Sequence, residues 1–419
     1  MPLSPDWLHL PLLYTTIGIV LSLSSTAVIG TFTALQKKEL IGDVLAHASL
    51  PGITIAFVIT GTKDTFFLTL GAFVSSKLAL FLIEYLTTYK KVKKDTALAF
   101  TLAFFWGIGL VGLTYIQKNV EGEAGGLEHI LFGNAASLTR SNSFSFVFFA
   151  FLLLLVLALL FRQWRLICFD PEFAESIGLP MRFLRPFFSC LTVLGIVIGV
   201  HAVGIVLMAS LLITPPTVAR YWTSSLLPML LLSAFFSSLG GVTGVALSYY
   251  YSNLRTGPCI VVCLTVIAFF SFFFAPKKGF LAREWTQYQY RKKIFNENIL
   301  KLFCEIAEED NNEGASHHIN TLLAKRPLDR KKSLNCLKRL TKNGFVTHSA
   351  PNRWQITPKG AKQGKTILRR HILWEEYLRK VTKMNPTQRH DNAESIEHLI
   401  SSRMEEVIEE SLKEKGEKD

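Results

Sequence analysis

The feature that most constrains this 419-residue chain is a series of long runs almost free of charged side chains in its first 276 residues. Since about 20 apolar residues cross a bilayer as a helix, the 34-residue uncharged run 186–219 predicts two membrane passes that turn near His201–Gly204. Together with the runs 11–36, 44–62, 65–89, 96–117, 141–161, 221–254 and 256–276, it predicts an all-α polytopic membrane domain of eight or nine transmembrane helices.

The charge distribution divides the chain at Pro276. Residues 1–276 hold 16 Lys+Arg and 12 Asp+Glu, whereas residues 277–419 hold 29 and 20, a net charge of +9. The first part is too poor in charge to be a water-soluble enzyme, and the second is too charged to lie in a bilayer. We therefore predict a transmembrane domain (1–276), a basic juxtamembrane linker (277–295) without a strong fold of its own, and a soluble part (296–419).

The basic residues of the short loops predict the orientation. With the N-terminus outside, 13 Lys and Arg fall in inner loops and four in outer loops, which agrees with the positive-inside rule. This assignment places the chain in the cytoplasmic (inner) membrane with its C-terminal part in the cytoplasm. The six cysteines are scattered rather than closely paired, as expected of packing residues in a reducing compartment.

The soluble part has the element order of a winged helix-turn-helix. Apolar spacing predicts a helix around 299–306, short helices at about 317–324 and 329–343, and a stop at Gly344. Two short β-strands, 345–348 and 353–357, flank a turn and form the predicted wing. We expect the DNA-binding domain to cover residues 296–364, and a helical metal-sensing and dimerisation region to cover 365–419.

Asp43 and His47 form an ionisable pair in the second predicted span. Their i, i+4 spacing places both side chains on one helix face, where they can reach the same cation. An ionisable pair at membrane depth is costly unless it binds something or lines a water-filled path, so a transport role is the first interpretation. The alternative is structural, with Asp43 capping the helix N-terminus beside Lys37 and Lys38 and His47 hydrogen-bonded to a neighbouring carbonyl.

Six stretches of the first part, taken in order, resemble the permease subunits of zinc, manganese and iron ABC importers. They are Gly30–Phe32, Gly42–Gly52, Glu128–Asn134, Phe169–Pro180, Gly204–Arg220 and Thr256–Pro258. The resemblance covers residues 10–276. It implies a membrane dimer or a pair of homologous permeases, an extracytoplasmic metal-binding protein and a separate ATPase.

The resemblance also assigns residues. The metal-path carboxylate and histidine of the family match Asp43 and His47. Residues 169–180 match the cytoplasmic segment on which the ATPase docks, and a solvated loop is the alternative interpretation. The predicted docking residues are Asp170, Glu172, Glu175 and Gly178. The sequence contains no Gly-x4-Gly-Lys-[Ser/Thr] loop. ATP hydrolysis is therefore expected of a partner, and this chain is not expected to be an enzyme.

The helix predicted over 329–343 carries basic residues at its start, which suits contact with DNA phosphates, and an asparagine that suits a base edge. Adhesion of this basic part to anionic lipid is the alternative. The predicted DNA-binding residues are Arg330, Lys331, Lys332, Asn335 and Arg353.

Histidines and carboxylates recur at helical spacing near the C-terminus. The predicted regulatory ligands are His371, Glu375, His390, Glu394, Glu397 and His398. Imidazole with several carboxylates suits Mn(II) or Fe(II) better than structural zinc. Salt bridges on helix surfaces are the alternative interpretation.

Residues 296–412 resemble the DtxR/MntR family of metal-dependent repressors. Ile356–Gly360, Arg370–Leu378 and Ala393–Ser401 carry this resemblance. It implies that the six regulatory residues are ligands, with Glu394 standing where iron-type members have cysteine. The family's ligand on the first helix falls near Asn298, a weak ligand, for which Glu297 is the substitute.

Two functions are compatible with these features. In the first, the chain is a metal importer permease fused to a metal-dependent repressor, which proteolysis within Lys277–Lys293 releases. In the second, the winged domain senses metal and gates transport without binding DNA.

Overall fold

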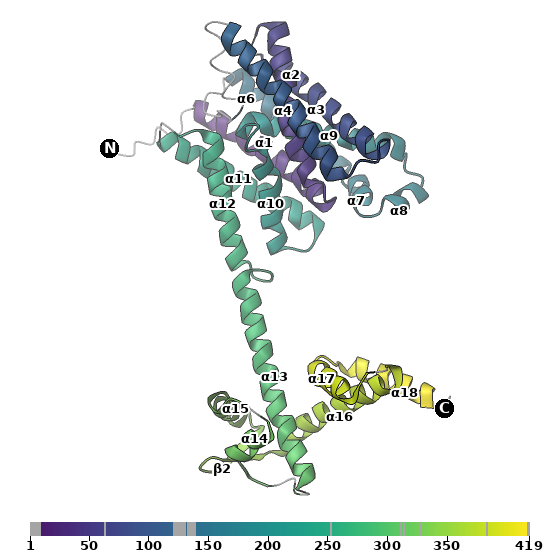
Figure 1. Ribbon diagram of the computed structural model, residues 1–419. Coiled ribbons are helices and arrows are strands. Elements are labelled where there is room, and N and C mark those ends of the chain that lie inside the picture. Colours follow the sequence, from purple (N-terminus) through teal and green to yellow (C-terminus); the bar gives the residue numbers. More distant parts are fainter. Residues whose placement is uncertain are drawn as a thin grey trace. The chain divides into compact units, whose positions relative to one another are not determined.

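The computed structural model divides into two compact units, residues 1–283 and 284–419 (Figure 1). It describes residues 10–416 except 63, 120–130, 132–139, 252–253, 311, 313–314, 327 and 383. Most of the stretch Glu128–Asn134 thus lies outside the described residues.

The first unit is a helical bundle (Figure 1). Its described helices are α1 (Leu10–Leu35), α2 (Glu39–Thr60), α3 (Thr65–Thr88), α4 (Lys94–Asn119), α6 (Arg140–Leu159), α7 (Phe161–Phe169), α8 (Pro171–Ser176), α9 (Met181–Val203), α10 (Met208–Trp222), α11 (Leu226–Tyr250) and α12 (Thr256–Phe274). Within the described residues, seven helices are long and apolar enough to cross a membrane. An eighth span arises if α6 and α7, bent by 69° relative to each other, are counted together.

The prediction of eight or nine spans is confirmed at its lower value, and the difference lies in α10. The long run 186–219 turns where expected, because α9 ends at Val203 and Gly204 takes a φ of 97°. The returning helix has only 15 residues, fewer than the roughly 20 that cross a bilayer. The end of α10 lies beside the segment that follows α12, since Lys278 Nζ donates to the carbonyls of Arg220 and Thr223 at 3.1 and 3.3 Å.

Close helix contacts through small residues hold the bundle together. A Cβ atom on Gly52 of α2 would collide with the Gly71 carbonyl of α3, so these two backbones touch. Serines add hydrogen bonds between helices: Ser75 Oγ donates to the Ala48 carbonyl at 2.7 Å, and Ser237 Oγ donates to the Leu23 carbonyl at 3.0 Å. Both devices are typical of helix packing in lipid, where apolar burial gives little driving force.

The second unit begins with α13 (Phe280–Glu309), β1 (His317–His318), α14 (Ile319–Lys325), α15 (Arg330–Lys342), β2 (Val346–Ala350) and β3 (Arg353–Ile356). The three strands form an antiparallel sheet in the order β1-β3-β2. This is the predicted winged helix-turn-helix, with Gly344 ending α15 at a φ of 74°. Strand β1 was not predicted, because two residues are too short for a strand pattern.

The expectation of a linker without a strong fold is wrong, because α13 is one helix through that segment. Two parts of this helix differ in burial. Side chains before Phe295 are largely exposed, whereas Ile299, Leu302 and Phe303 are fully buried in the core of the winged fold. Propensity and a buried anchor are enough to continue the helix backward through basic residues that do not pack.

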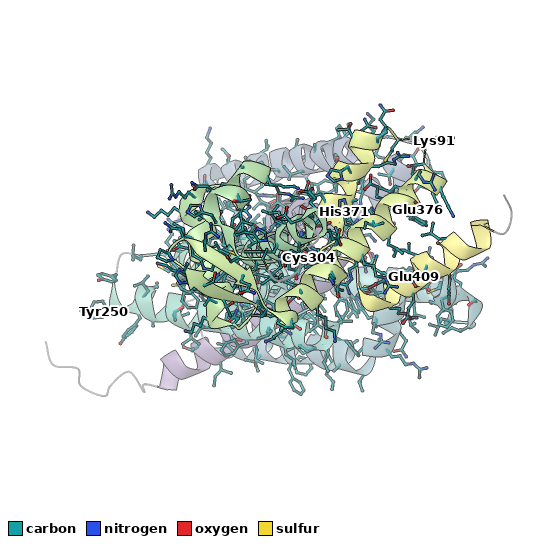
Figure 2. All side chains as sticks on the ribbon, turned by 90° about the horizontal axis from the view of Figure 1, so that it is seen from below. Lys91, Tyr250, Cys304, His371, Glu376 and Glu409 are labelled. Atoms are coloured by element: carbon teal, nitrogen blue, oxygen red, sulfur yellow. The ribbon has the colours of Figure 1, made fainter. Side chains whose placement is uncertain are left out.

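Three helices complete the second unit: α16 (Pro358–Val381), α17 (Pro386–Ile396) and α18 (Ser402–Gly416). Helix α16 packs tightly against α13. A Cβ atom on Gly364 would lie 2.5 Å from the Sγ atom of Cys304, the residue labelled in Figure 2. The absence of a side chain at Gly364 therefore allows the close contact between the two helices. This packing places the predicted ligands of α16 and α17 beside α13.

Candidate metal sites and interaction surfaces

The pair Asp43 and His47 lies inside α2, on a face turned into the membrane unit. His47 Nε2 is 3.4 Å from Asp43 Oδ1, and their side chains are 16% and 29% exposed. The ring of Trp106 on α4 meets the imidazole edge-on, with centroids 4.5 Å apart. The contact with Trp106 restricts the orientation of the imidazole, and the Oδ1 atom of Asp43 lies beside its Nε2 atom.

The structural alternative for this pair is wrong. Helix α2 begins at Glu39 and has Lys38 as its N-cap residue, so Asp43 lies within the helix and does not cap it. Among the described residues, His47 Nδ1 is buried without a hydrogen-bond partner, a costly arrangement for a polar atom. A carboxylate beside an unsatisfied imidazole fits a divalent cation such as a transported metal ion.

The predicted ATPase-docking segment forms the short helix α8. Two of its four predicted residues have structural roles: Asp170 accepts a hydrogen bond from the Phe173 N–H at 3.0 Å, and Glu175 pairs with Arg185 at 2.9 Å. Gly178 ends the segment at a φ of 82°, and Glu172 is exposed. What the sequence did not indicate is an exposed apolar set on this segment, formed by Phe169, Phe173 and Ile177, which are 61%, 51% and 49% exposed.

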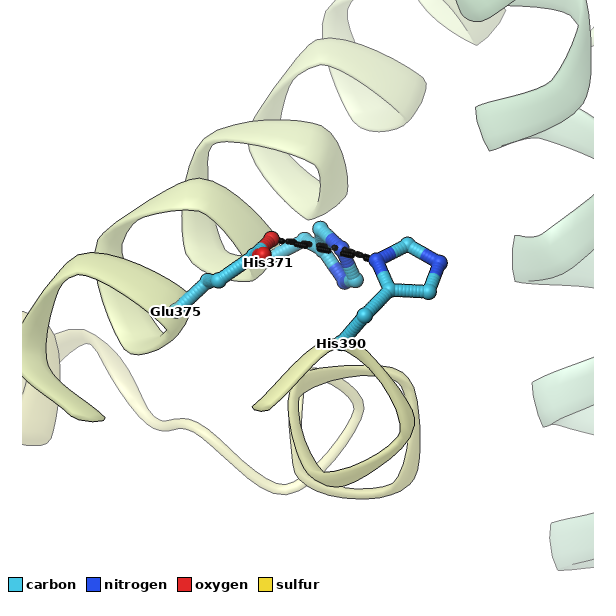
Figure 3. A group of neighbouring side chains, drawn as sticks. All are labelled: His371, Glu375 and His390. Carbon is cyan, nitrogen blue, oxygen red and sulfur yellow. Dashed lines mark hydrogen bonds and ion pairs between the residues drawn. The ribbon is translucent and has the colours of Figure 1, made fainter. Parts of the chain in front are cut away.

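Three of the six predicted regulatory ligands gather into one cluster (Figure 3). Within the described residues, His371 and Glu375 of α16 and His390 of α17 place one ligand atom each within 4.8 Å of the others. His371 Nε2 is 3.1 Å from His390 Nδ1 and 3.5 Å from Glu375 Oε2. Two imidazoles and a carboxylate around one point fit a divalent metal ion.

Glu397 orients the His371 ring of this cluster through the ring nitrogen that faces away from Glu375 and His390. His371 Nδ1 lies 2.6 Å from Glu397 Oε2, so the ring donates its proton there and directs the Nε2 lone pair toward Glu375 and His390. A carboxylate behind the histidine is a usual support for a metal ligand. Burial tends to raise the pKa of Glu397, but hydrogen bonds from His371 and Lys301 outweigh it, so the pKa is lowered.

The other three predicted ligands do not form such a cluster. Glu397 Oε2 also accepts from Lys301 Nζ at 2.7 Å, and Glu394 Oε1 accepts from Arg326 at 2.5 Å. His398 joins the first helix instead: its Nδ1 lies 2.8 Å from Glu297 Oε2, and its Nε2 lies 2.9 Å from Asn298 Oδ1. Both α13 positions predicted from the resemblance, Glu297 and Asn298, therefore contact His398. Lys301 was not predicted, although a single lysine in the apolar segment 299–303 was a visible signal.

The predicted DNA-binding residues lie at the start of α15 and on the wing. Asp329 caps the helix by accepting from the Lys332 N–H at 2.9 Å, and this hydrogen bond lowers the pKa of Asp329. All five predicted side chains are exposed: Arg330, Lys331, Lys332, Asn335 and Arg353. Four follow one another along α15, and Arg353 begins β3 beside the turn at Asn352, whose φ is 61°.

Residues 12–275 match the ABC 3 transport family. The chain belongs to this family. Residues 357–417 match the iron dependent repressor, metal binding and dimerisation domain, so a repressor-type domain is fused to the permease unit.

Individual proteins agree with the assignment to the transport family. The manganese transport system membrane protein MntC of Bacillus subtilis (strain 168) is 35% identical over 361 residues, which cover 86% of this chain and 82% of that protein. The zinc transport system membrane protein TroC of Treponema pallidum (strain Nichols) is 34% identical over 62% of this chain and 88% of its own length. A chain of PsaBC from Streptococcus pneumoniae, solved in complex with Fab, is 28% identical and aligns with a TM-score of 0.59 over 67% of this chain and 97% of its own.

As an ABC 3 permease, the chain is the membrane subunit of a transporter and not an enzyme, as expected from the sequence. Family membership implies an ATPase, a substrate-binding protein and a second permease subunit as partners. The repressor-type domain implies a divalent metal ion, which the cluster of His371, Glu375 and His390 has the ligands to hold.

Proposed function

We propose that this chain is the permease subunit of an importer for a divalent transition metal, Mn(II), Fe(II) or Zn(II), in the cytoplasmic membrane. The observation that carries the proposal is the pair Asp43 and His47 on α2, with its unsatisfied imidazole nitrogen, inside a domain of the ABC 3 family. Similarity to manganese and zinc transport proteins supports the choice of ion. The importer would receive its ion from an extracytoplasmic metal-binding protein.

Replacing Asp43 by Asn or His47 by Gln tests this function. Both variants remove a metal ligand and keep the side-chain volume, so the transporter should assemble normally and lose metal uptake by roughly tenfold or more. The measurement is uptake of radioactive Mn, Fe and Zn by membranes that contain the chain with its ATPase and binding protein. Wild-type uptake of all three ions by both variants would remove the pair from the transport path.

We further propose that residues 284–419 act in the cytoplasm as a metal-responsive repressor. The winged fold, the exposed basic start of α15 and the cluster of His371, Glu375 and His390 support this role. The predicted ligands include no cysteine, which favours Mn(II) or Fe(II) over structural zinc. When bound, the ion would join α16 to α17 through these three side chains.

Two modes of action are open to this unit. Repression requires two copies of α15 on one duplex, and an anionic membrane surface nearby opposes this, so we propose that part of the product is cut within Lys277–Lys293. Gating of transport without DNA is the second candidate, and it requires no cut in the helix from Phe280 to Glu309. Detection of the cut product, described in the Discussion, decides between them.

A further inference from the structure

The six predicted regulatory ligands separate into two groups. The first group is His371, Glu375 and His390, which face one another. The second group is Glu394, Glu397 and His398, and each of its two carboxylates meets a basic side chain from the winged fold. We propose that Lys301 and Arg326 take the place of a second metal ion, so that the C-terminal unit binds one divalent ion, at the first group only. This inference rests on the proposed metal-responsive function of that unit.

Lys301 is built into the second group rather than lying near it by chance. Its side chain is 1% exposed, that of Glu397 is 0% exposed, and their charged atoms are 2.7 Å apart. Taking a lysine out of water is costly, and the charge is retained because it is paired. A divalent ion on Glu397 Oε2 would lie within a few ångströms of this ammonium group, where repulsion in a dry interior is strong.

The remaining ligands of the second group are also engaged. Arg326, at the end of α14, pairs with Glu394 at 2.5 Å and reaches Glu305 of α13 at 3.6 Å. Both imidazole nitrogens of His398 lie within 2.9 Å of side-chain oxygens of α13. Among the described residues, Glu397 Oε1 is buried without a hydrogen-bond partner and lies 3.5 Å from His398 Nε2. Since Lys301 and Arg326 already neutralise the two carboxylates of this group, little negative charge remains to hold an ion.

The same contacts link the first group to the DNA-binding fold. Glu397 Oε2 lies within hydrogen-bond distance of both His371 Nδ1 and Lys301 Nζ, so one oxygen connects a metal-binding histidine on α16 with the buried part of α13. An ion on His371 Nε2 requires the tautomer with the proton on Nδ1, which this contact selects. An ion held by the first group would thus be connected through Glu397 to α13, and with it to the winged fold.

Counting ions on variants of the full-length chain tests this inference. The purified chain in detergent is dialysed against excess Mn(II), and bound Mn per chain is measured by elemental mass spectrometry. We expect His371→Ala/His390→Ala to hold one ion fewer than the wild-type chain, and Glu394→Ala/His398→Ala to hold as many as the wild type. Ions bound by the permease unit are common to all samples and cancel.

The outcomes separate this inference from the function on which it rests. If both double variants lose one ion, the second group binds metal and the inference is overturned, while the metal-responsive function stands. If neither loses an ion, both fail. Circular dichroism of each variant checks folding, and Glu394→Gln/His398→Gln provides a conservative second pair.

A gain of binding gives an independent check. Lys301→Met removes the internal charge at similar length and takes one of its two partners from Glu397 Oε2, so this variant should hold one Mn(II) more than the wild type. Adding His398→Ala should abolish the gain. A folded Lys301→Met chain that binds the wild-type number of ions would contradict the claim that Lys301 occupies the place of an ion; should it not fold, the two double variants decide.

Discussion

Cys336 shows how strongly the winged fold shields a single reactive group. It lies fully buried on α15, with its Sγ atom 3.1 Å from Asn296 Oδ1. Burial raises the pKa of the thiol to about 11, although the nearby Arg339 guanidinium lowers it somewhat. The reactive form of cysteine is the thiolate, so this side chain should be inert at neutral pH.

We predict that Cys336 in the folded chain reacts with iodoacetamide at pH 8 at least about a hundredfold more slowly than in the unfolded chain. The reason is the thiolate fraction, which falls about tenfold for each unit by which the pKa rises above 9.0. Its rate should increase with pH up to about 11. Peptide mapping by mass spectrometry measures it, with the same cysteine in guanidinium as the control. Equal rates in both states at pH 8 would contradict the burial of Cys336.

Residue spacing predicts contacts between side chains whose positions are close along the chain. The spacing of Asp43 and His47 predicted one helix face, and the structure places these side chains 3.4 Å apart. It could not find the pair Lys301 and Glu397, because 96 residues separate them and only the packing of α13 against α16 and α17 brings them together. The transport role of Asp43 and His47 stays a prediction.

At the scale of elements, α8 and the residue that follows it carry an exposed apolar surface that is not packed into the bundle core. Phe173 and Ile177 lie on the segment that the sequence resemblance associates with the ATPase, and each is about half exposed. Exposed apolar side chains gathered on one segment mark an interaction site more often than a free surface. The sequence identified the segment by its acidic residues, because exposure of an aromatic side chain is not visible in a residue pattern.

We predict that Phe173→Asp or Ile177→Asp weakens the association of the permease with its ATPase, because a charge replaces an apolar contact at a desolvated interface. Co-purification of the ATPase with a tagged permease measures the effect, and uptake should fall in parallel. Tyr250→Asp is the control, since this tyrosine is 76% exposed at the end of α11. Normal ATPase recovery with both the Phe173 and the Ile177 variant would place the docking surface elsewhere.

Element boundaries were predicted well where charge or glycine marks them and poorly elsewhere. The turn after α9 and the end of α15 both fall at glycines with positive φ. Helix α10 was expected to be a full span, but a count of uncharged residues does not show where a helix begins within a run. The linker was expected to lack a fold of its own, yet a helix anchored by Ile299 and Leu302 continues through it.

At the scale of the whole molecule, one chain joins an apolar domain of membrane-spanning helices to a domain rich in charged residues. The change in charge density suggests a boundary at Pro276, and the two compact units of the structure divide between Arg283 and Glu284. What composition could not show is that α13 belongs to both: its first half is exposed, and its second half is part of a core. The two proposed functions differ in whether this helix stays intact.

The exposed half of α13 is where a protease would meet the least resistance. Unwinding residues 280–293 uncovers little packed surface, because burial begins only near Glu297, so local opening there is cheap compared with opening of the winged fold. We therefore predict that part of the product is cut within Lys277–Lys293 and that a soluble C-terminal fragment appears.

Tags at both ends, followed by blotting of membrane and soluble fractions from metal-replete and metal-starved cells, detect this fragment. The released fragment should bind DNA upstream of its own gene in the presence of Mn(II) or Fe(II) and lose that binding with a chelator. Lys331→Glu/Lys332→Glu is the matched control for DNA contact, since both side chains are exposed on α15 and the fold should survive. If only full-length, membrane-bound chain is found under both conditions, release is excluded. The gating alternative then remains, in which this unit senses metal and acts on transport while α13 stays intact.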